Sequence, residues 1–275
     1  MRKARMHGLK IHRPIIMYKA VASTLILLCI YLLYNQRQTN NRAASLPDIQ
    51  IFDFRSNASL PVHLDQIDPS VELVPRGFRY LDNTHRLGLI HMGNWIHIVD
   101  STLATASSVS NPRILLLKRG PQLVTCPGTW SLVGEHANRD EQPIETVRRA
   151  IFEELGPQVL EHVITHGRIR NMTALPIYYE RDYGDANEGR IDRQVTYIWL
   201  VEMNLGAMME SQDNNYQTID QIIDDDGFFQ FDSEVAETKW LPIYELEQWV
   251  KEDADEKKFF CHETIISLMN LGFER

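Results

Sequence analysis

The chain has 275 residues, 44% of them hydrophobic, and a formal net charge of −9. This length leaves room for one domain with extensions, and the composition excludes a disordered or fibrous protein. The first 34 residues carry six basic and no acidic side chains, so the remaining 241 carry 22 basic and 37 acidic ones, a net charge of −15. This acidity argues against duplex nucleic acid as a partner and is compatible with a site that collects divalent cations.

Residues 15–34 form an apolar run interrupted only by Lys19, whose long side chain can reach the membrane surface. Twenty residues are about the length that crosses ~30 Å of hydrocarbon. Basic residues precede the run and no acidic residue occurs before Asp48, so residues 1–14 are predicted to be a cytosolic tail. The prediction is a signal anchor in a single-pass type II membrane protein, with the body in the secretory-pathway lumen (Golgi or endoplasmic reticulum).

Two other interpretations of the N-terminus stay open, a cleaved signal peptide and a mitochondrial presequence. The long basic segment and the lack of a small-residue cleavage site disfavour the first, and the continuous apolar block disfavours the second. The triplets that begin at Asn57 and Asn171 fit glycosylation in a lumen. Residues 35–70 are polar and rich in Asn, Gln and Ser, which predicts a stem, so the folded domain is expected at residues 71–275. Within it, Cys126 and Cys261 could form a disulfide, and the sequence leaves their state open.

The rest of the chain alternates strand and helix patterns. Strands are predicted at 88–100, 113–119, 174–180, 194–202 and 234–241, helices at 242–251 and 259–271, a strand or turn at 158–164, and a solvated acidic loop at 204–233. The third and fourth strands are expected to form a hairpin. Elements mixed in this order favour an α/β fold, an α/β/α sandwich with a mixed sheet.

A short acidic helix follows a turn-rich stretch and begins at Pro143, a residue that the first helical turn tolerates. Its apolar residues recur at helical spacing, and the other face carries charged residues, listed as Glu145, Arg149, Glu153 and Glu154. Arg149 is expected to be held between Glu145 and Glu153, each four residues away. Glu141, just before the helix, is expected to converge with Glu153 and Glu154 on a hard divalent cation that bridges phosphate oxygens and activates a water.

This spacing resembles the signature of the Nudix hydrolases, G-x5-E-x7-R-E-U-x-E-E-x-G-U. The matching residues are Glu141, Arg149, Ile151, Glu153, Glu154 and Gly156. Three positions depart from it: Glu135 stands at the first glycine, Ala150 at the glutamate after the arginine, and Pro157 at the last apolar position. The resemblance implies Mg²⁺ or Mn²⁺ bound by Glu153 and Glu154, and Ala150 moves the role of base elsewhere. Glu234 and Glu237, on a later strand, are the candidates for a further ligand or the base.

The surroundings also resemble isopentenyl-diphosphate isomerase and hydrolases close to it. The residues that carry this likeness are His85, His91, His136, the Pro127-Gly128-x-Trp130 turn and the Glu234/Glu237 pair. In that isomerase, comparable histidines and glutamates bind metal, which makes His91 and His136 candidate ligands. The catalytic cysteine of the isomerase has no counterpart in Val133-Gly134-Glu135, so isomerase chemistry is disfavoured.

The sequence thus predicts a membrane-anchored enzyme that hydrolyses a diphosphate bond in a small nucleotide-type or prenyl diphosphate substrate. Arg149, Glu153, Glu141 and Glu237 are its candidate catalytic residues, Lys118 and Arg119 its candidate substrate-binding residues, and Glu153, Glu154 and Glu234 its candidate metal ligands. The rival prediction is a Nudix-fold binding module without activity, which the changes at Glu135 and Ala150 favour.

Overall fold

The computed structural model describes residues 49–55, 63–100, 112–184, 188–209, 216–225, 227–246 and 248. The predicted cytosolic tail, the apolar run at 15–34, the sequon at Asn57, Cys261 and the predicted helix at 259–271 lie outside these residues. Among the described residues, no helix is both long and apolar enough to span a bilayer.

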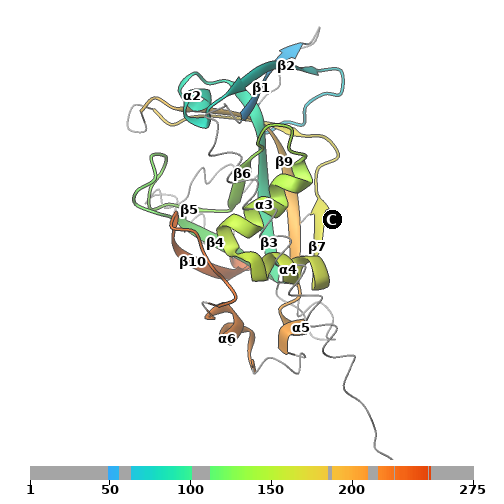
Figure 1. Ribbon diagram of the computed structural model, residues 1–275, viewed down its shortest axis with the longest axis vertical. Helices are drawn as coiled ribbons and strands as arrows, with labels where there is room; N and C mark the ends of the chain where they lie inside the picture. Colours follow the sequence, from blue (N-terminus) through green and yellow to red (C-terminus); the bar gives the residue numbers. More distant parts are fainter. Residues whose placement is uncertain are drawn as a thin grey trace, which may run out of the picture. The chain divides into compact units, whose positions relative to one another are not determined.

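The sheet is built around two long strands, β3 (Ile90–Asp100) and β9 (Ile191–Met203), which run parallel along their whole shared length (Figure 1). On its other side, β3 meets three strands in turn: β1 (Ile49–Arg55), β6 (Val133–His136) and β4 (Arg113–Arg119). Antiparallel strands complete the sheet, with β2 (Glu72–Arg79) on β1, β5 (Trp130–Ser131) and β10 (Val235–Pro242) on β4, and β7 (Arg168–Asn171) and β8 (Ile177–Asp182) on β9. The α/β fold with a mixed sheet is therefore confirmed.

Strand β1 lies inside the segment that composition assigns to the stem. It pairs with β2 over its full length and with β3 at Ile51 and Phe52. Ile49 and Ile51 are buried, because alternate residues of the strand face the domain. The sheet therefore begins before the predicted start of the domain at residue 71.

Residues of β4 alternate between two apolar cores, one on each face of the sheet. Leu115 and Leu117 pack against α3 (Pro143–Leu155) and α4 (Pro157–His166), whereas Ile114 and Leu116 pack on the opposite face with Leu246. This period of two explains why a wholly apolar stretch forms a strand that is buried on both faces. In Figure 1 the two helices lie across β3 and β9.

The stretch at 158–164, predicted to be a strand or turn, is instead part of helix α4. Gly156 ends α3 with φ 103°, and a Cβ at this position would lie 2.9 Å from the Cβ of Gln230. Pro157 then takes the first position of α4, where its missing N–H costs no hydrogen bond. Val159, Leu160 and Val163 bury one face of α4, so the short apolar run follows the helical period.

The acidic stretch at 204–233 is only partly the solvated loop that its charge predicts. It contains α5 (Gly206–Met209) and α6 (Ile219–Ile223), and Phe228 and Phe229 are buried in the core beneath α3. The backbone N–H of Gln230 donates to the carbonyl of Leu155 at 2.8 Å. Aromatic burial therefore attaches this insertion to the end of α3 next to the site described below.

Candidate functional site

A cavity of about 550 Å³ opens beside the end of α3. Its lining comes from β3, β4, β6, α3, β9, the short helix α2 (Leu81–Arg86) and the segment that leads into β10. Two sets of side chains whose donor atoms can bind metal ions contribute to this lining. The first, named the acidic wall, consists of Glu135, Glu153, Glu154, Asp232 and Glu234. The second is part of a histidine cluster made of His85, His91 and His136.

The side chain of Arg149, which is 17% exposed, connects the elements that carry these groups. Its Nε and Nη2 donate to the two carboxylate oxygens of Glu141, both at 3.0 Å, and Nη1 donates to Glu153 at 3.0 Å. Nη2 also donates to the backbone carbonyl of His136 at 2.7 Å. One planar guanidinium thus joins the loop before α3, the last turns of α3 and strand β6.

Glu141 forms an ion pair with Arg149 and does not line the cavity. Its side chain is 2% exposed, accepts hydrogen bonds from the Asn138 N–H and the Thr146 hydroxyl, and is absent from the cavity lining. Burial acts to raise the pKa of Glu141, but the hydrogen bonds and charge of Arg149, together with the hydrogen bonds from Asn138 and Thr146, outweigh it and lower that pKa. Glu141 therefore stays ionised. The predicted convergence of Glu141 with Glu153 and Glu154 on one cation is not what the structure has.

The predicted pair between Glu145 and Arg149 is also wrong. The carboxylate of Glu145 turns back and accepts the backbone N–H of Gln142 at 3.0 Å, which closes a capping box at the start of α3. This local hydrogen bond satisfies a backbone donor that the first helical turn leaves free, so the side chain is used for capping.

Carboxylates crowd the acidic wall. Burial, followed by the charges of Glu135 and Glu234, raises the pKa of Glu154 well above its usual value. Burial also raises the pKa of Glu135, although Arg149 opposes the shift. The Nη1 atom of Arg149 lies 3.4 Å from Glu135 and 3.0 Å from Glu153, so these two carboxylates share one nitrogen. The five carboxylates of the acidic wall outnumber the guanidinium groups of Arg149 and Arg119, and a bound cation would lower these pKa values.

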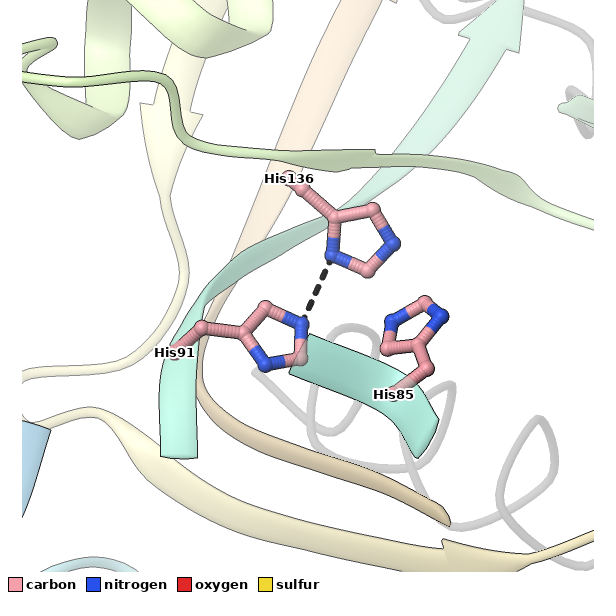
Figure 2. A group of neighbouring side chains, drawn as sticks. All are labelled: His85, His91 and His136. Carbon is pink, nitrogen blue, oxygen red and sulfur yellow. Dashed lines mark hydrogen bonds between the residues drawn. The ribbon is translucent and has the colours of Figure 1, made fainter. Parts of the chain in front are cut away.

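The histidine cluster brings together side chains from α2, β3 and β6 (Figure 2). The Nε2 atom of His91 lies 3.0 Å from Nδ1 of His136, and one ring nitrogen from each of the three histidines lies within 4.8 Å of the others. Burial lowers the pKa of His85 and of His91 to about 4 and that of His136 well below its usual value. Neutral imidazoles at neutral pH have the lone pairs that a metal ion needs.

Asp192, at the start of β9, extends this cluster. Its Oδ1 lies 3.5 Å from Nε2 of His91 and 3.7 Å from Nε2 of His85, and its Oδ2 accepts from the Gln194 amide at 2.8 Å. Oδ1 of Asp192 and Nε2 of His85 are buried and have no hydrogen-bond partner among the described residues. Three imidazoles and a carboxylate are the donors that Zn²⁺, Mn²⁺ or Fe²⁺ accepts, so this cluster could hold one such ion.

The other predicted residues divide between the cavity and its surroundings. Glu153, Glu154 and Glu234 line the cavity together, as do Lys118 and Arg119. Glu237 does not: it is 56% exposed and binds Lys118 at 2.9 Å, directly across the β10–β4 ladder. The position of Glu237 gives no support to a role as the base. Arg119 donates to both the carbonyl and the hydroxyl of Thr125, which fixes it against the loop that leads to β5.

Sequence reasoning missed Glu135, Asp192 and Asp232 as members of the site. In the sequence Glu135 stands out only as a departure from a glycine, and nothing near Asp192 marks it as a site residue. Asp192 reaches the histidines because β9 pairs in parallel with β3, in a register that sets Gln194 opposite His91. Such a pairing of residues about 100 positions apart leaves no local signal.

A family model described as the NUDIX domain matches residues 101–262, more than half of the chain. The chain belongs to the Nudix hydrolase family. Members of this family are pyrophosphohydrolases, and the α3 helix with Arg149, Glu153 and Glu154 is its signature helix. No sequence among the curated proteins matches this Nudix chain significantly.

Solved structures resemble the fold at low sequence identity. The MutT protein from Methanosarcina mazei Go1 is 14% identical, with a TM-score of 0.39, 67% of this chain covered and 94% of that one. A C. elegans Ap4A hydrolase binary complex is 17% identical, with a TM-score of 0.37 and coverages of 65% and 92%. The E. coli dihydroneopterin triphosphate pyrophosphohydrolase is 11% identical, with a TM-score of 0.40 and coverages of 67% and 96%.

The ion pair between Arg149 and Glu141 yields a prediction about stability. Arg149→Met leaves a buried carboxylate without its cation and is expected to lower the free energy of unfolding by about 3–5 kcal/mol. The double variant Arg149→Met with Glu141→Gln removes that charge and is expected to be more stable than Arg149→Met alone. Urea unfolding of both variants and of Glu141→Gln measures the coupling. Additive losses would contradict the paired arrangement.

The buried His91 yields a prediction about pH. Its pKa is about 4 in the folded Nudix domain and about 6.5 in an unfolded chain, so the unfolded state binds more protons between these values. The free energy of unfolding is therefore expected to fall as the pH falls from 7 to 5 in EDTA, and to fall less in His91→Gln. Urea unfolding at both pH values measures the difference. Equal slopes in His91→Gln and wild type would contradict the prediction.

Proposed function

We propose that this Nudix domain hydrolyses the diphosphate bond of a small nucleotide-type or prenyl diphosphate with Mg²⁺ or Mn²⁺. The observation that carries the proposal is the acidic wall, in which Glu153, Glu154 and Glu234 face one cavity and Arg149 binds Glu153. A volume of about 550 Å³ is within the range of small-molecule sites. The substrate would enter as an anion and requires positive charge opposite these carboxylates.

The acidic wall has the chemistry that a hard divalent cation needs. Its donors are carboxylate oxygens, the ligand type that Mg²⁺ and Mn²⁺ prefer. The raised pKa of Glu154, caused by burial and by the charges of Glu135 and Glu234, supports the fit, because a cation relieves both effects. When bound, the cation would supply charge neutralisation at the phosphates and activation of a water.

The chain's own residues would bind and orient. Arg149 binds the carboxylate of Glu153, and the buried Glu141 binds Arg149 on the side away from the cavity lining. Glu141 and Arg149 would therefore act as positioning residues. Lys118 lies 5.5 Å above the ring of Trp130 and lines the cavity, where its ammonium can meet a phosphate oxygen. Apolar lining residues, among them Leu81, Leu123 and Val124, offer a surface for the base or prenyl group of a substrate.

A binding module without hydrolysis is the second candidate function. The observations that favour it are the absence of a carboxylate at Ala150 and the exposed, paired state of Glu237. An isomerase of the isopentenyl-diphosphate type receives support from the histidine cluster but lacks its thiol. Strand β6 carries Glu135 directly before His136, and Cys126 is not among the residues that line the cavity.

We also propose that residues 15–34 anchor the chain in a secretory-pathway membrane with the Nudix domain in the lumen. This rests on the basic tail, the length of the apolar run and the two sequons. Asn171 lies exposed on β7, and its side-chain oxygen accepts from the N–H and hydroxyl of Thr173 within the same triplet. The exposed side chain of Asn171 is where a glycan would be attached.

For the hydrolase, we expect the purified chain to release phosphate or a monophosphate from members of a nucleotide and prenyl diphosphate panel in Mn²⁺. Glu153→Gln with Glu154→Gln should lower kcat by about 100-fold or more, the scale at which one preorganised electrostatic contact contributes. The matched control is Glu161→Gln on α4, outside the cavity lining, which should keep full activity. Binding of a panel member without turnover would favour the binding module instead.

For the topology, we expect the chain made in secretory cells to run faster on a gel after glycosidase treatment. The shift should become smaller in Asn171→Gln and vanish when Asn57→Gln is added. A C-terminal epitope that is accessible from the cytosol in selectively permeabilised cells would contradict a lumenal domain.

A further inference from the structure

Two departures from the Nudix signature lie next to Arg149: Ala150 follows it in the sequence, and Glu135 lies 3.4 Å from its Nη1. Ala150, in place of the expected glutamate, is 0% exposed and packs in the core between α3 and the sheet. Glu135, in place of the expected glycine, is on β6, where its side chain is 22% exposed and lines the cavity. One carboxylate is lost from the helix, and one is gained on the strand that faces it.

Contacts on both sides hold the Glu135 carboxylate at this wall. One oxygen accepts the backbone N–H of His136 at 2.9 Å, and the other lies 3.4 Å from Nη1 of Arg149. That same nitrogen donates to Glu153 at 3.0 Å, so Glu135 and Glu153 approach one guanidinium from two elements. Glu135 is therefore positioned beside the end of α3 and does not point to solvent.

Near Glu135 the negatively charged side chains outnumber the positively charged ones. Arg149 already meets the buried carboxylate of Glu141 with two hydrogen bonds, so Glu135, Glu141 and Glu153 share its one positive charge. Lys118 is paired with Glu237, and the charge of Arg119 acts on Glu154, so the carboxylates still outnumber the cations beside them. A divalent ion between Glu135 and the acidic residues of α3 would balance this excess.

We propose that Glu135 is a ligand of the catalytic cation, and that it supplies from β6 the carboxylate that α3 lacks at Ala150. The two changes in the signature then move one metal ligand from the helix to the strand. The ligands of the cation would be carboxylates of the acidic wall, namely Glu135, Glu153, Glu154 and Glu234. This inference rests on the proposed function, because the cation is the one that serves hydrolysis.

The first experiment measures Mn²⁺ binding to the full chain by electron paramagnetic resonance of the free ion. Glu135→Gln is expected to weaken binding about 10- to 100-fold, a loss typical of altered metal-site groups. Glu161→Gln is the matched control and should bind Mn²⁺ as the wild type does. Wild-type affinity in a folded Glu135→Gln chain overturns the proposal.

A second measurement needs no variant and so does not depend on the folding of Glu135→Gln. Carbodiimide labelling of wild-type carboxylates, read by mass spectrometry with and without Mn²⁺, is expected to show protection of Glu135 together with Glu153 and Glu154. Glu161 should be labelled equally in both samples. Equal labelling of Glu135 in both samples, with protection of Glu153 and Glu154, overturns the proposal.

The two proposals fail in different ways. If the wild type hydrolyses no diphosphate but Glu135→Gln still weakens Mn²⁺ binding, the proposed function fails and Glu135 remains a ligand. If the wild type hydrolyses a diphosphate and Glu135→Gln binds Mn²⁺ normally, the function stands and the ligand assignment is wrong.

Discussion

The site depends on the position of the Arg149 guanidinium. It donates two hydrogen bonds to Glu141, one to Glu153 and one to the carbonyl of His136. This one guanidinium therefore links the loop before α3, the helix α3 itself and strand β6. Burial alone would lower its pKa, but the hydrogen bond with Glu141 and the surrounding carboxylates raise it above the usual value, so the group stays charged. The charge of this one side chain permits several carboxylates to gather beside it without forcing all of them to take up protons.

The fold brings a second set of donors to the same cavity. The parallel pairing of β3 with β9 sets Asp192 and Gln194 beside His91, while the antiparallel pairing of β3 with β6 brings His136 to the same place. Glu135 and His136 are consecutive, so the acidic wall and the histidine cluster meet at β6. Oxygen donors suited to a hard cation and nitrogen donors suited to a borderline one thus line a single cavity.

The departures from the Nudix signature have structural reasons. Pro157 begins α4, and Gly156 before it allows the sharp turn between the two helices. Ala150 packs in the apolar core in a position without exposure, where a carboxylate would lose its hydration among apolar side chains. Glu135 occupies the strand that faces this helix. These three changes are consistent with one another, and they leave the helix, its arginine and its terminal glutamates in place.

The sequence by itself determined the α/β class, the strands at β3, β4, β8, β9 and β10, the signature helix and the cavity residues Glu153, Glu154 and Glu234. Apolar patterns with the period of a strand or a helix are local, and the signature lies within one short stretch. Both can therefore be recognised in the sequence before the tertiary structure is known. Only the tertiary structure decided that β1 joins the sheet, that 158–164 is a helix and that Phe228 and Phe229 attach the acidic insertion to the core. It also decided that Glu141 pairs with Arg149 and that Glu237 pairs with Lys118. It placed Glu135 and Asp192 in the site. The helix at 158–164 has a local helical spacing, but its apolar run is too short to separate a helix from a strand until its burial is known. The other assignments depend on strand pairing and burial between residues far apart in the chain, and no local spacing encodes them.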